Sequence, residues 1–589
     1  MTESKNDYLI FAVFSSVWVF LGWVAYLLAL SGFFYSWIFG GFFLLLLLVA
    51  GRQMVLKKIS LNISREFIII SSSVLIFACL SSFFVTPTIF TGRDQGSISE
   101  AAIRLSQNHK LEFSTPASTE FFKIYGAGKA LNFPGFYYNT NGQLTTQFPI
   151  AYISWLAVFY SFFGLIGLIV ANAVLLSIFL ISFYLLARLF VSIRFSSILL
   201  TLAATSFPIF WFFKFTLSEN MALALLWLSA LWLTLFIKEK RLFFYFSFLI
   251  SAGLLVFTRI EGIFFLLAGL TVIFFFTKGN ELWKGKRKIL LLYPAAFLGI
   301  LLLLNFTKDI YFYKEIAKAV LGFGNNDGGN ISFAQKFLSP MLMETKLFFL
   351  YGIADAVILG IFGIIYFTIR KNREILIPFF VTVPSFVYLI NSWISSDHPW
   401  MLRRFVFSIV PVFIFYSVTF LAKWFEEKDL FSLKFISYLV FASMLAFNLI
   451  LFVEYFPVSE NKKLLAETEK ISTNFSSTDL VLIDRYSSYD PFSMIGGPMS
   501  FIYGKNSVYF FNLEDLKKID REKFSGIYII APDGNAENYI NSIGKENISS
   551  TKSYSIKNEK LFNLEMKDDD PILPIKKEYE ATGKILMIR

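Results

Sequence analysis

The sequence has a single cysteine and two histidines among its 589 residues. Because Cys79 has no second cysteine to pair with, an intrachain disulfide is excluded, and so is a metal site built on thiolates. His109 and His398 are too few for a histidine-rich metal site, and neither a His-Glu-x-x-His run nor a Gly-x-Ser-x-Gly run occurs. We therefore expect no metal and no cofactor, and no zinc protease or serine hydrolase chemistry.

Charged residues are also scarce, at 16% of the chain, whereas 56% of the residues are hydrophobic and the mean hydropathy is +0.61. This balance is typical of a polytopic α-helical membrane protein. The formal net charge is +11, but the lysines and arginines stand in short clusters between apolar runs, as they do in cytoplasmic loops. The charge therefore indicates topology, and we expect membrane lipids rather than nucleic acid as partners.

Apolar runs of membrane-spanning length recur along the first three quarters of the chain. We predict thirteen spans, at residues 8–30, 34–50, 67–86, 164–187, 195–213, 217–237, 241–258, 261–277, 289–306, 347–369, 375–395, 404–422 and 434–455. The first run lacks a cleavage pattern of small residues, so we interpret it as a retained span rather than a signal peptide. One further run, 149–163, is short enough to cross the membrane or to lie in its interface.

The basic clusters decide how these spans are oriented. If residues 149–163 do not cross, all the following clusters face the cytoplasm, as the positive-inside rule requires. They are Lys57 and Lys58; Arg188 and Arg194; Lys238, Lys240 and Arg241; Lys284–Lys288; and Arg370, Lys371 and Arg373. We therefore predict an N-terminus inside and a C-terminus outside, in the plasma membrane of a bacterium or archaeon.

Two regions are predicted to lie outside the membrane. The first large external loop, 87–148, belongs to a membrane domain of residues 1–456 and contains surface helices. One of them is expected over Gly96–Asn108, with its apolar stripe on the membrane surface. Residues 457–589 are more polar. Short β-rich runs at 481–483 and 527–530, with helical patterns at 461–471 and 536–543, predict a soluble extracytoplasmic α/β domain.

The predicted orientation gathers acids and arginines on the outer face. They come from separate loops: Asp94, Glu219, Arg259, Glu261, Arg403 and Arg404. An arginine guanidinium suits a phosphate group, and a carboxylate can remove a proton from an incoming hydroxyl. The combination favours transfer from a phosphate-linked donor.

Taken singly, these residues are explained about as well by structural roles as by catalysis or phosphate binding. Asp94 is a candidate helix cap, and Glu219 complements a helix dipole at the start of a span. Arg403 and Arg404 are candidate interfacial anchors that extend toward lipid headgroups. His398, which precedes a proline in a loop, is more easily read as a structural or headgroup contact than as a proton shuttle.

Several motifs in order resemble the glycosyltransferase-C superfamily, in its branch of protein O-mannosyltransferases and lipid A aminoarabinose transferases. Asp94 opens the first external loop and is followed by the run Ser97–Ser106, and Phe148–Tyr152 resembles the proline-led helix that closes that loop. The later motifs are Ser218-Glu219, Thr258-Arg259-Ile260-Glu261-Gly262, and His398–Phe405 followed by Pro411. Together these motifs cover nearly the whole membrane region.

The resemblance implies an integral membrane glycosyltransferase, a hexosyl- or pentosyltransferase. Such enzymes move a sugar from a polyprenyl-phosphate donor, with inversion, to a lipid, glycan or protein hydroxyl on the outer face. It assigns Asp94 the role of general base or acceptor-orienting group, and Arg259 or Arg403 a contact to the donor phosphate. Two positions depart from the pattern of the protein mannosyltransferases: Gln95 follows Asp94 where they usually have Glu, and Ile260 replaces the usual proline.

The resulting hypothesis is that Asp94 acts with support from Glu219 and Glu261. Arg259, Arg403 and Arg404 then hold the donor phosphate. Three further candidate site residues are Glu100, His398 and Asp355. The alternatives are a transporter or flippase of lipid-linked saccharides, for which Asp355 inside a predicted span is the main argument, and a membrane scaffold without catalysis.

Overall fold

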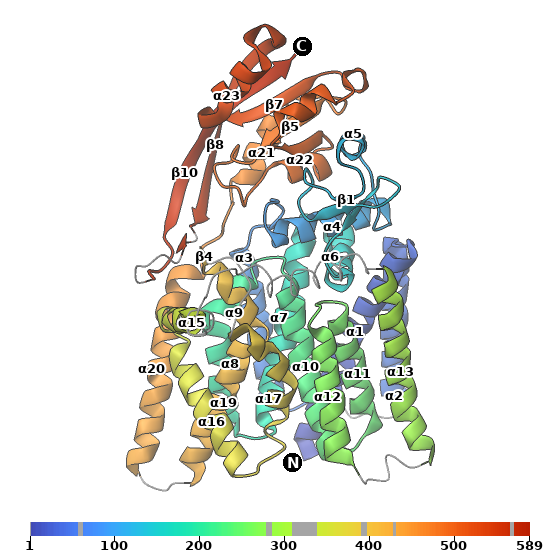
Figure 1. Ribbon diagram of the computed structural model, residues 1–589. Helices are drawn as coiled ribbons and strands as arrows, with labels where there is room; N and C mark the ends of the chain where they lie inside the picture. The colour runs from blue at the N-terminus through green and yellow to red at the C-terminus, as the bar shows by residue number, and fades with distance from the viewer. Residues whose placement is uncertain are drawn as a thin grey trace, which may run out of the picture.

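The computed structural model describes residues 2–56, 63–278, 285–308, 339–389, 397–427, 431–562, 564–565 and 571–589. A layer of near-vertical helices forms its lower part, the first large loop lies on top of that layer, and the C-terminal domain stands above the loop (Figure 1). The two termini lie at opposite ends of the molecule. Most of the predicted loop 307–344 and the end of the predicted span 375–395 lie outside the described residues.

The lower part is helical throughout, because long apolar runs can satisfy their backbone hydrogen bonds in lipid only as helices. Its helices are α1 (Thr2–Ser31), α2 (Ser36–Leu56), α3 (Arg65–Phe83), α6 (Ile150–Phe163), α7 (Leu165–Arg188), α8 (Ile193–Thr205), α9 (Phe207–Phe212), α10 (Ser218–Glu239), α11 (Leu242–Val256), α12 (Gly262–Thr277), α13 (Gly285–Lys308), α15 (Ser339–Leu350), α16 (Ala354–Ile369), α17 (Ile377–Thr382) with the 3-10 helix Val383–Leu389, α18 (Arg403–Val406), α19 (Ile409–Glu427) and α20 (Phe431–Tyr455).

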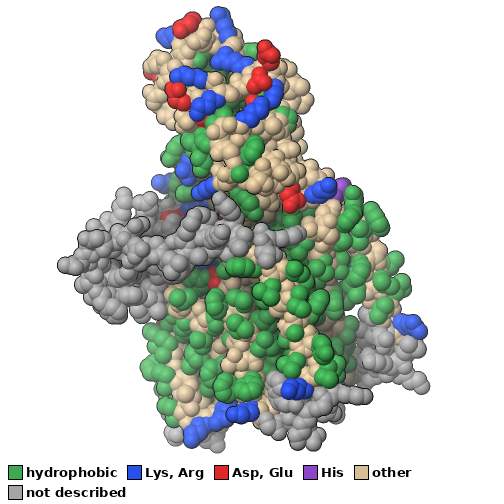
Figure 2. Space-filling model, turned by 45° about the vertical axis from the view of Figure 1, so that its right-hand side comes forward, with side chains coloured by type: hydrophobic (Ala, Val, Ile, Leu, Met, Phe, Trp, Pro, Cys, Tyr) green, Lys and Arg blue, Asp and Glu red, His purple; other side chains and the backbone are tan. Residues whose placement is uncertain are grey.

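The protein is a multi-pass membrane protein. Within the described residues, seven helices are long and apolar enough to cross a membrane, or eight if the bent pair α15–α16 counts as one span. On the face that Figure 2 shows, the helical layer is largely apolar, with Lys and Arg side chains at its lower edge. The described part of each of the thirteen predicted runs is mostly helical. Several of these helices are short, so the count of thirteen and the orientation stay predictions.

Breaks interrupt some of the predicted spans, among them one at Ser206 and one near Gly352. The run 195–213 divides into α8 and α9 at Ser206. The run 347–369 bends by 114° between α15 and α16, where Gly352 has a φ of +69°, a conformation that glycine adopts without strain. Asp355 therefore lies in the first turn of α16. The prediction that it stands well inside a span was wrong, because a turn separates it from α15.

The first large loop folds into a compact layer. It contains α4 (Asp94–Asn108), α5 (Pro116–Tyr125) and an antiparallel sheet of β1 (Gly128–Lys129), β2 (Phe136–Tyr138) and β3 (Leu144–Thr146). The helix predicted over 96–108 is confirmed, starting two residues earlier. Its apolar stripe does not lie on the membrane surface, however, because Ile98, Ala102 and Leu105 are buried inside the protein where α4 packs on α6.

The run 149–163 forms α6, a helix of 14 residues. At 1.5 Å per residue it rises about 21 Å, which is less than the roughly 30 Å of a bilayer core. Its middle, from Ala151 to Phe159, is buried, and it packs against α1, α4 and α7. This helix is therefore a support beneath the first large loop.

The C-terminal residues form an α/β domain. Its elements are α21 (Leu464–Ser472), β5 (Leu480–Asp484), α22 (Gly496–Phe501), β6 (Asn506–Phe510), β7 (Ile527–Pro532), α23 (Asp533–Ile543), β8 (Ile548–Leu561) and β10 (Lys576–Ile588). The strand order is β6-β5-β7-β10-β8. β5 pairs in parallel with β6 and β7, whereas β10 pairs antiparallel with β7 and β8. The sequence predicted β5, β7, α21 and α23 but missed the hairpin of β8 and β10.

The domain contacts the layers below it at several places, and two of these contacts lie near the ends of α4 and α18. A short strand β9 (Leu564–Glu565), which follows β8, pairs with β4 (Asp397–His398) just before α18. Higher up, the Gln107 side chain at the end of α4 donates a hydrogen bond to the Phe501 carbonyl of α22, at 2.9 Å. The domain therefore packs directly on the segments that carry Asp94 and Arg403.

Candidate active site

Arg259, in the turn between α11 and α12, is the centre of a buried ionic cluster. One of its terminal nitrogens, Nη1, lies 2.8 Å from Glu219 Oε1, and the other, Nη2, lies 2.8 Å from Glu261 Oε1. Its Nε donates to Glu261 Oε2 at 3.2 Å, which makes the pairing with Glu261 bidentate. Nη1 also donates to Ser218 Oγ at 3.3 Å. Arg259 thus fixes both carboxylates at the start of two apolar helices.

Arg403 and Arg404, on the short helix α18, extend the cluster outward. Arg403 Nη1 lies 2.5 Å from Asp94 Oδ2, and Arg403 Nε lies 3.8 Å from Glu219 Oε1. Arg404 Nη1 lies 3.5 Å from Glu261 Oε1. The structure therefore brings together all six acids and arginines that the sequence predicted to meet, from four separate segments of the chain.

Asp94 does not cap its helix. It is the first residue of α4, and the N-cap position belongs to Arg93, which makes no side-chain capping hydrogen bond. The Asp94 carboxylate instead faces the Arg403 guanidinium, and its side chain is 38% exposed. Of the two roles considered from the sequence, capping is wrong, and Asp94 is left as the accessible carboxylate of the cluster.

Aromatic rings hold the arginines in place. Trp400 lies between two of them, with its ring centroid 4.5 Å from the Arg93 guanidinium carbon and 4.8 Å from that of Arg403. Phe407 lies 4.8 Å from the Arg259 guanidinium carbon. Such stacking favours a cation and limits its rotation. Trp400 is therefore part of the wall of the cluster.

Arg93 connects the cluster to the α/β domain. It forms an ion pair with Asp397, and its guanidinium carbon lies 4.0 Å from the ring of Phe492 in that domain. Beside it, Thr91 and Met494 exchange two backbone hydrogen bonds of 3.2 and 2.9 Å. The sequence prediction missed Arg93 and Asp397, although both stand in the polar runs next to Asp94 and Arg403 and carry opposite charges.

Several buried guanidinium nitrogens in the cluster have no hydrogen-bond acceptor among the described residues. Within the described part of the chain, no acceptor has hydrogen-bonding geometry to the buried atoms Nε and Nη1 of Arg403 or Nε of Arg404. Arg403 Nη1 is close to Asp94, but the contact has the distance of an ion pair without the angle of a hydrogen bond. Buried donors without acceptors are costly, so this arrangement fits a site that completes its hydrogen bonds with an anionic ligand.

The two central arginines, Arg259 and Arg403, remain protonated although they are buried. Burial alone would lower the pKa of the Arg259 guanidinium, but the carboxylates of Glu219 and Glu261 outweigh burial and raise it. Burial likewise opposes the charge of Arg403, and Asp94 and Glu219 raise its pKa. Both arginines therefore stay cationic at any physiological pH. In the described residues no group of three or more His, Cys, Asp or Glu side chains is placed to hold a metal ion.

The three further candidates from the sequence lie elsewhere. Glu100 is buried nearly two turns along α4, where it pairs with Arg104 at 3.4 Å. His398 is buried, and its Nδ1 shares a 2.8 Å hydrogen bond with the Tyr351 hydroxyl. Burial lowers the pKa of His398, despite the nearby Asp397, so the ring is neutral at pH 7. With Asp355 at the start of α16, none of the three belongs to the ionic cluster.

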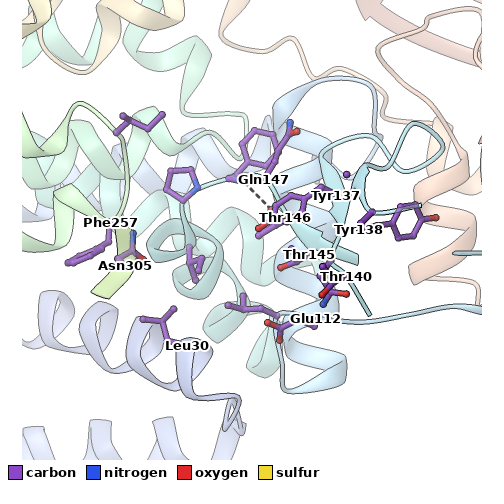
Figure 3. Close-up of a pocket in the computed structure, with 18 of the residues that line it drawn as sticks. Leu30, Glu112, Tyr137, Tyr138, Thr140, Thr145, Thr146, Gln147, Phe257 and Asn305 are labelled. Atoms are coloured by element: carbon purple, nitrogen blue, oxygen red, sulfur yellow. Dashed lines mark hydrogen bonds between the residues drawn. The ribbon is translucent and has the colours of Figure 1, made fainter. Parts of the chain in front are cut away.

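A cavity of about 530 Å³ lies beside the cluster. Phe257 and Asn305 line one side and Thr145 and Thr146 of β3 the other, as Figure 3 shows. Ile260, between Arg259 and Glu261 in the α11–α12 turn, is also part of its wall. The lining mixes hydroxyl and amide groups with apolar side chains, which suits an amphipathic ligand or a saccharide.

Comparison with known proteins gives structural but not sequence matches. No protein-family model matches the chain, and no curated protein matches it. Two crystal structures of ArnT from Cupriavidus metallidurans match over 88% of this chain and 97% of theirs. The one bound to undecaprenyl phosphate has 10% sequence identity and a TM-score of 0.48, and the apo state has 11% and 0.49. At these identities and TM-scores, the chemistry of the site has to be argued from its own residues.

Proposed function

We propose that the protein transfers a sugar from a polyprenyl-phosphate carrier to a lipid, glycan or protein hydroxyl on the extracytoplasmic side of the membrane. The observation that carries this proposal is the set of buried Arg403 and Arg404 donors without acceptors, next to the exposed carboxylate of Asp94. A phosphate oxygen supplies the missing acceptors, and a carboxylate at the same place supplies a base.

The reaction follows from the two kinds of group. The acceptor hydroxyl attacks the anomeric carbon of the donor sugar, and its proton passes to the Asp94 carboxylate. The new bond joins the acceptor oxygen to the anomeric carbon, while the bond from that carbon to the phosphate oxygen breaks. The polyprenyl phosphate leaves with the bonding electrons, and the guanidinium groups of Arg403 and Arg404 stabilise its added charge. Attack from the side opposite the leaving group gives inversion.

In this proposal Arg259, Glu219 and Glu261 position the other residues and do not contact the substrate. Arg259 binds Glu219 and Glu261 closely enough that all three are occupied with one another. Glu219 also lies 3.8 Å from Arg403 Nε, and Glu261 lies 3.5 Å from Arg404 Nη1, so the two carboxylates keep Arg403 and Arg404 in position. The cavity bounded by Ile260 and Thr145 offers room for the acceptor on the far side of the same turn.

The main argument for a transporter, the alternative function, does not hold in the structure. It depended on an ionisable residue deep in a span, and Asp355 stands instead at the beginning of α16, after the sharp bend. A scaffold without catalysis is distinguished from the proposal by turnover: it would bind a polyprenyl-phosphate sugar and never release it as product.

Arg404→Gln is expected to weaken the binding of polyprenyl phosphate about 10- to 100-fold, because one charge-assisted hydrogen bond to phosphate is worth about 1.5–3 kcal/mol. The measurement is titration of the purified protein in nanodiscs with polyprenyl phosphate. Arg370→Gln, at an exposed arginine that follows α16, is the matched control and should bind like the wild type. Equal affinity in both variants and the wild type would remove Arg404 from the donor site.

A further inference from the structure

The α/β domain contains a second cavity, of about 340 Å³, away from the ionic cluster. It lies at the carboxyl ends of β5 and β6, beside α23 in the upper domain of Figure 1. After β5 the chain forms β6 on one side of it and then crosses to form β7 on the other, parallel to both. In open α/β sheets, ligands bind at the carboxyl ends of strands where the connections diverge in this way.

A fixed carboxylate forms the floor of this cavity. Asp484, the buried last residue of β5, accepts a 2.8 Å hydrogen bond at Oδ1 from the Tyr486 backbone. Its Oδ2 accepts hydrogen bonds from Asn535 Nδ2 at 3.2 Å and from the Tyr539 hydroxyl at 2.9 Å. Because Asp484 holds one amide hydrogen of Asn535, the amide oxygen and the second amide hydrogen remain in a fixed orientation toward the cavity.

Exposed aromatic rings form the rim. The Tyr486 side chain is 49% exposed and that of Phe511 is 44% exposed, although both are large and hydrophobic. Tyr509 packs on Phe511 with ring centroids 5.3 Å apart. The ring of Tyr125 from α5 also stacks near Phe511, with ring centroids 6.4 Å apart. The rim is therefore a braced aromatic surface, and exposed rings of this kind mark a binding site.

This combination fits a saccharide. A pyranose ring presents C–H groups on its faces, which pack on aromatic rings, and hydroxyl groups on its edges, which pair with amides and carboxylates. An exclusively anionic ligand such as a free phosphate is disfavoured, because the floor is a carboxylate. Arg485 lines the same cavity and forms no ion pair with any described residue, so one acidic group on the sugar has a partner there.

We propose that this cavity is a saccharide-binding site, with Tyr486 and Phe511 as the stacking surface and Asn535 as the group that recognises hydroxyls. The site binds glycan in the envelope independently of the transfer reaction below it. Its occupancy does not require Asp94, and loss of transfer does not empty it.

The test uses the full-length protein in nanodiscs on an array of immobilised oligosaccharides that contain neutral hexoses, N-acetylhexosamines or uronic acids. The wild type is expected to bind at least one class, and Tyr486→Ala and Asn535→Ala are expected to reduce that binding at least tenfold. Arg485→Gln should reduce binding selectively if the bound class is the acidic one. Asp94→Asn should leave binding unchanged, which separates this site from the proposed transfer.

Tyr489→Ala is the matched control, because Tyr489 is also an exposed tyrosine of this domain but packs on Tyr579, outside the cavity. It should bind glycans like the wild type. Absence of binding to every oligosaccharide by the wild type would overturn the proposal. So would binding that Tyr486→Ala and Asn535→Ala leave intact, or that Tyr489→Ala reduces equally.

Discussion

Replacing Asp94 by asparagine is expected to lower sugar transfer by a factor of about 10²–10⁴, the usual contribution of a general base. Asparagine has nearly the same shape but cannot take the proton of the acceptor hydroxyl. Protein in nanodiscs would be supplied with labelled polyprenyl-phosphate sugars and an extract of the cell envelope as acceptor. The measured quantity is the initial rate at which label passes from the carrier to another molecule.

The protein should remain folded in this variant, because the Asp94 side chain is 38% exposed and the amide oxygen of asparagine can still accept a hydrogen bond from the Arg403 guanidinium. Asp355→Asn serves as the control, since it neutralises a carboxylate of the membrane region outside the cluster. It should transfer sugar at the rate of the wild type. Near-normal transfer by Asp94→Asn, at wild-type thermal stability, would remove Asp94 as the base.

The second large effect concerns stability. Arg259→Met is expected to lower the free energy of unfolding by about 3–5 kcal/mol, because it leaves the carboxylates of Glu219 and Glu261 in the protein interior without their main partner. Thermal unfolding of the purified protein in detergent measures the change. Arg404→Gln removes a cation that makes only a 3.5 Å contact to Glu261, so it should unfold close to the wild-type temperature.

A double variant tests the physical reason for that loss. In Arg259→Met/Glu219→Gln the buried charge at position 219 is removed together with its partner, so part of the lost stability should return. If Arg259→Met is as stable as the wild type, or if the second substitution adds its own full loss, then the ion pairs of Arg259 do not support the cluster in the way described.

Much of the membrane layer is predictable because its signal is local. An apolar run such as 164–187 must be helical in lipid, whatever surrounds it, and it forms α7. The gathering of the site residues is predictable for a related reason: polar residues next to apolar runs lie at the ends of helices, and the charge of the loops predicts which ends share a face. This argument placed Asp94, Glu219 and Arg403 together, and the structure confirms that they are in contact.

What remained unpredicted depends on contacts between distant residues. The sequence does not reveal that Arg93 pairs with Asp397 or packs on Phe492, because these residues are hundreds of positions apart. The stripe of α4 was placed on lipid because nothing local distinguishes lipid from the protein surface of α6. The strands β8 and β10 were missed because their Lys, Glu and Ser side chains hide the alternation that marks a strand.

The central claim is that the chain transfers a sugar to an acceptor in the cell envelope, with Asp94 as the base. Mass spectrometry of surface glycans and glycolipids tests it most directly, in cells with the gene, without it, and with the gene restored as the wild type or as Asp94→Asn. The account predicts one sugar substituent that disappears with the gene and returns with the wild type but not with Asp94→Asn. Identical glycans and glycolipids in all four strains would contradict it.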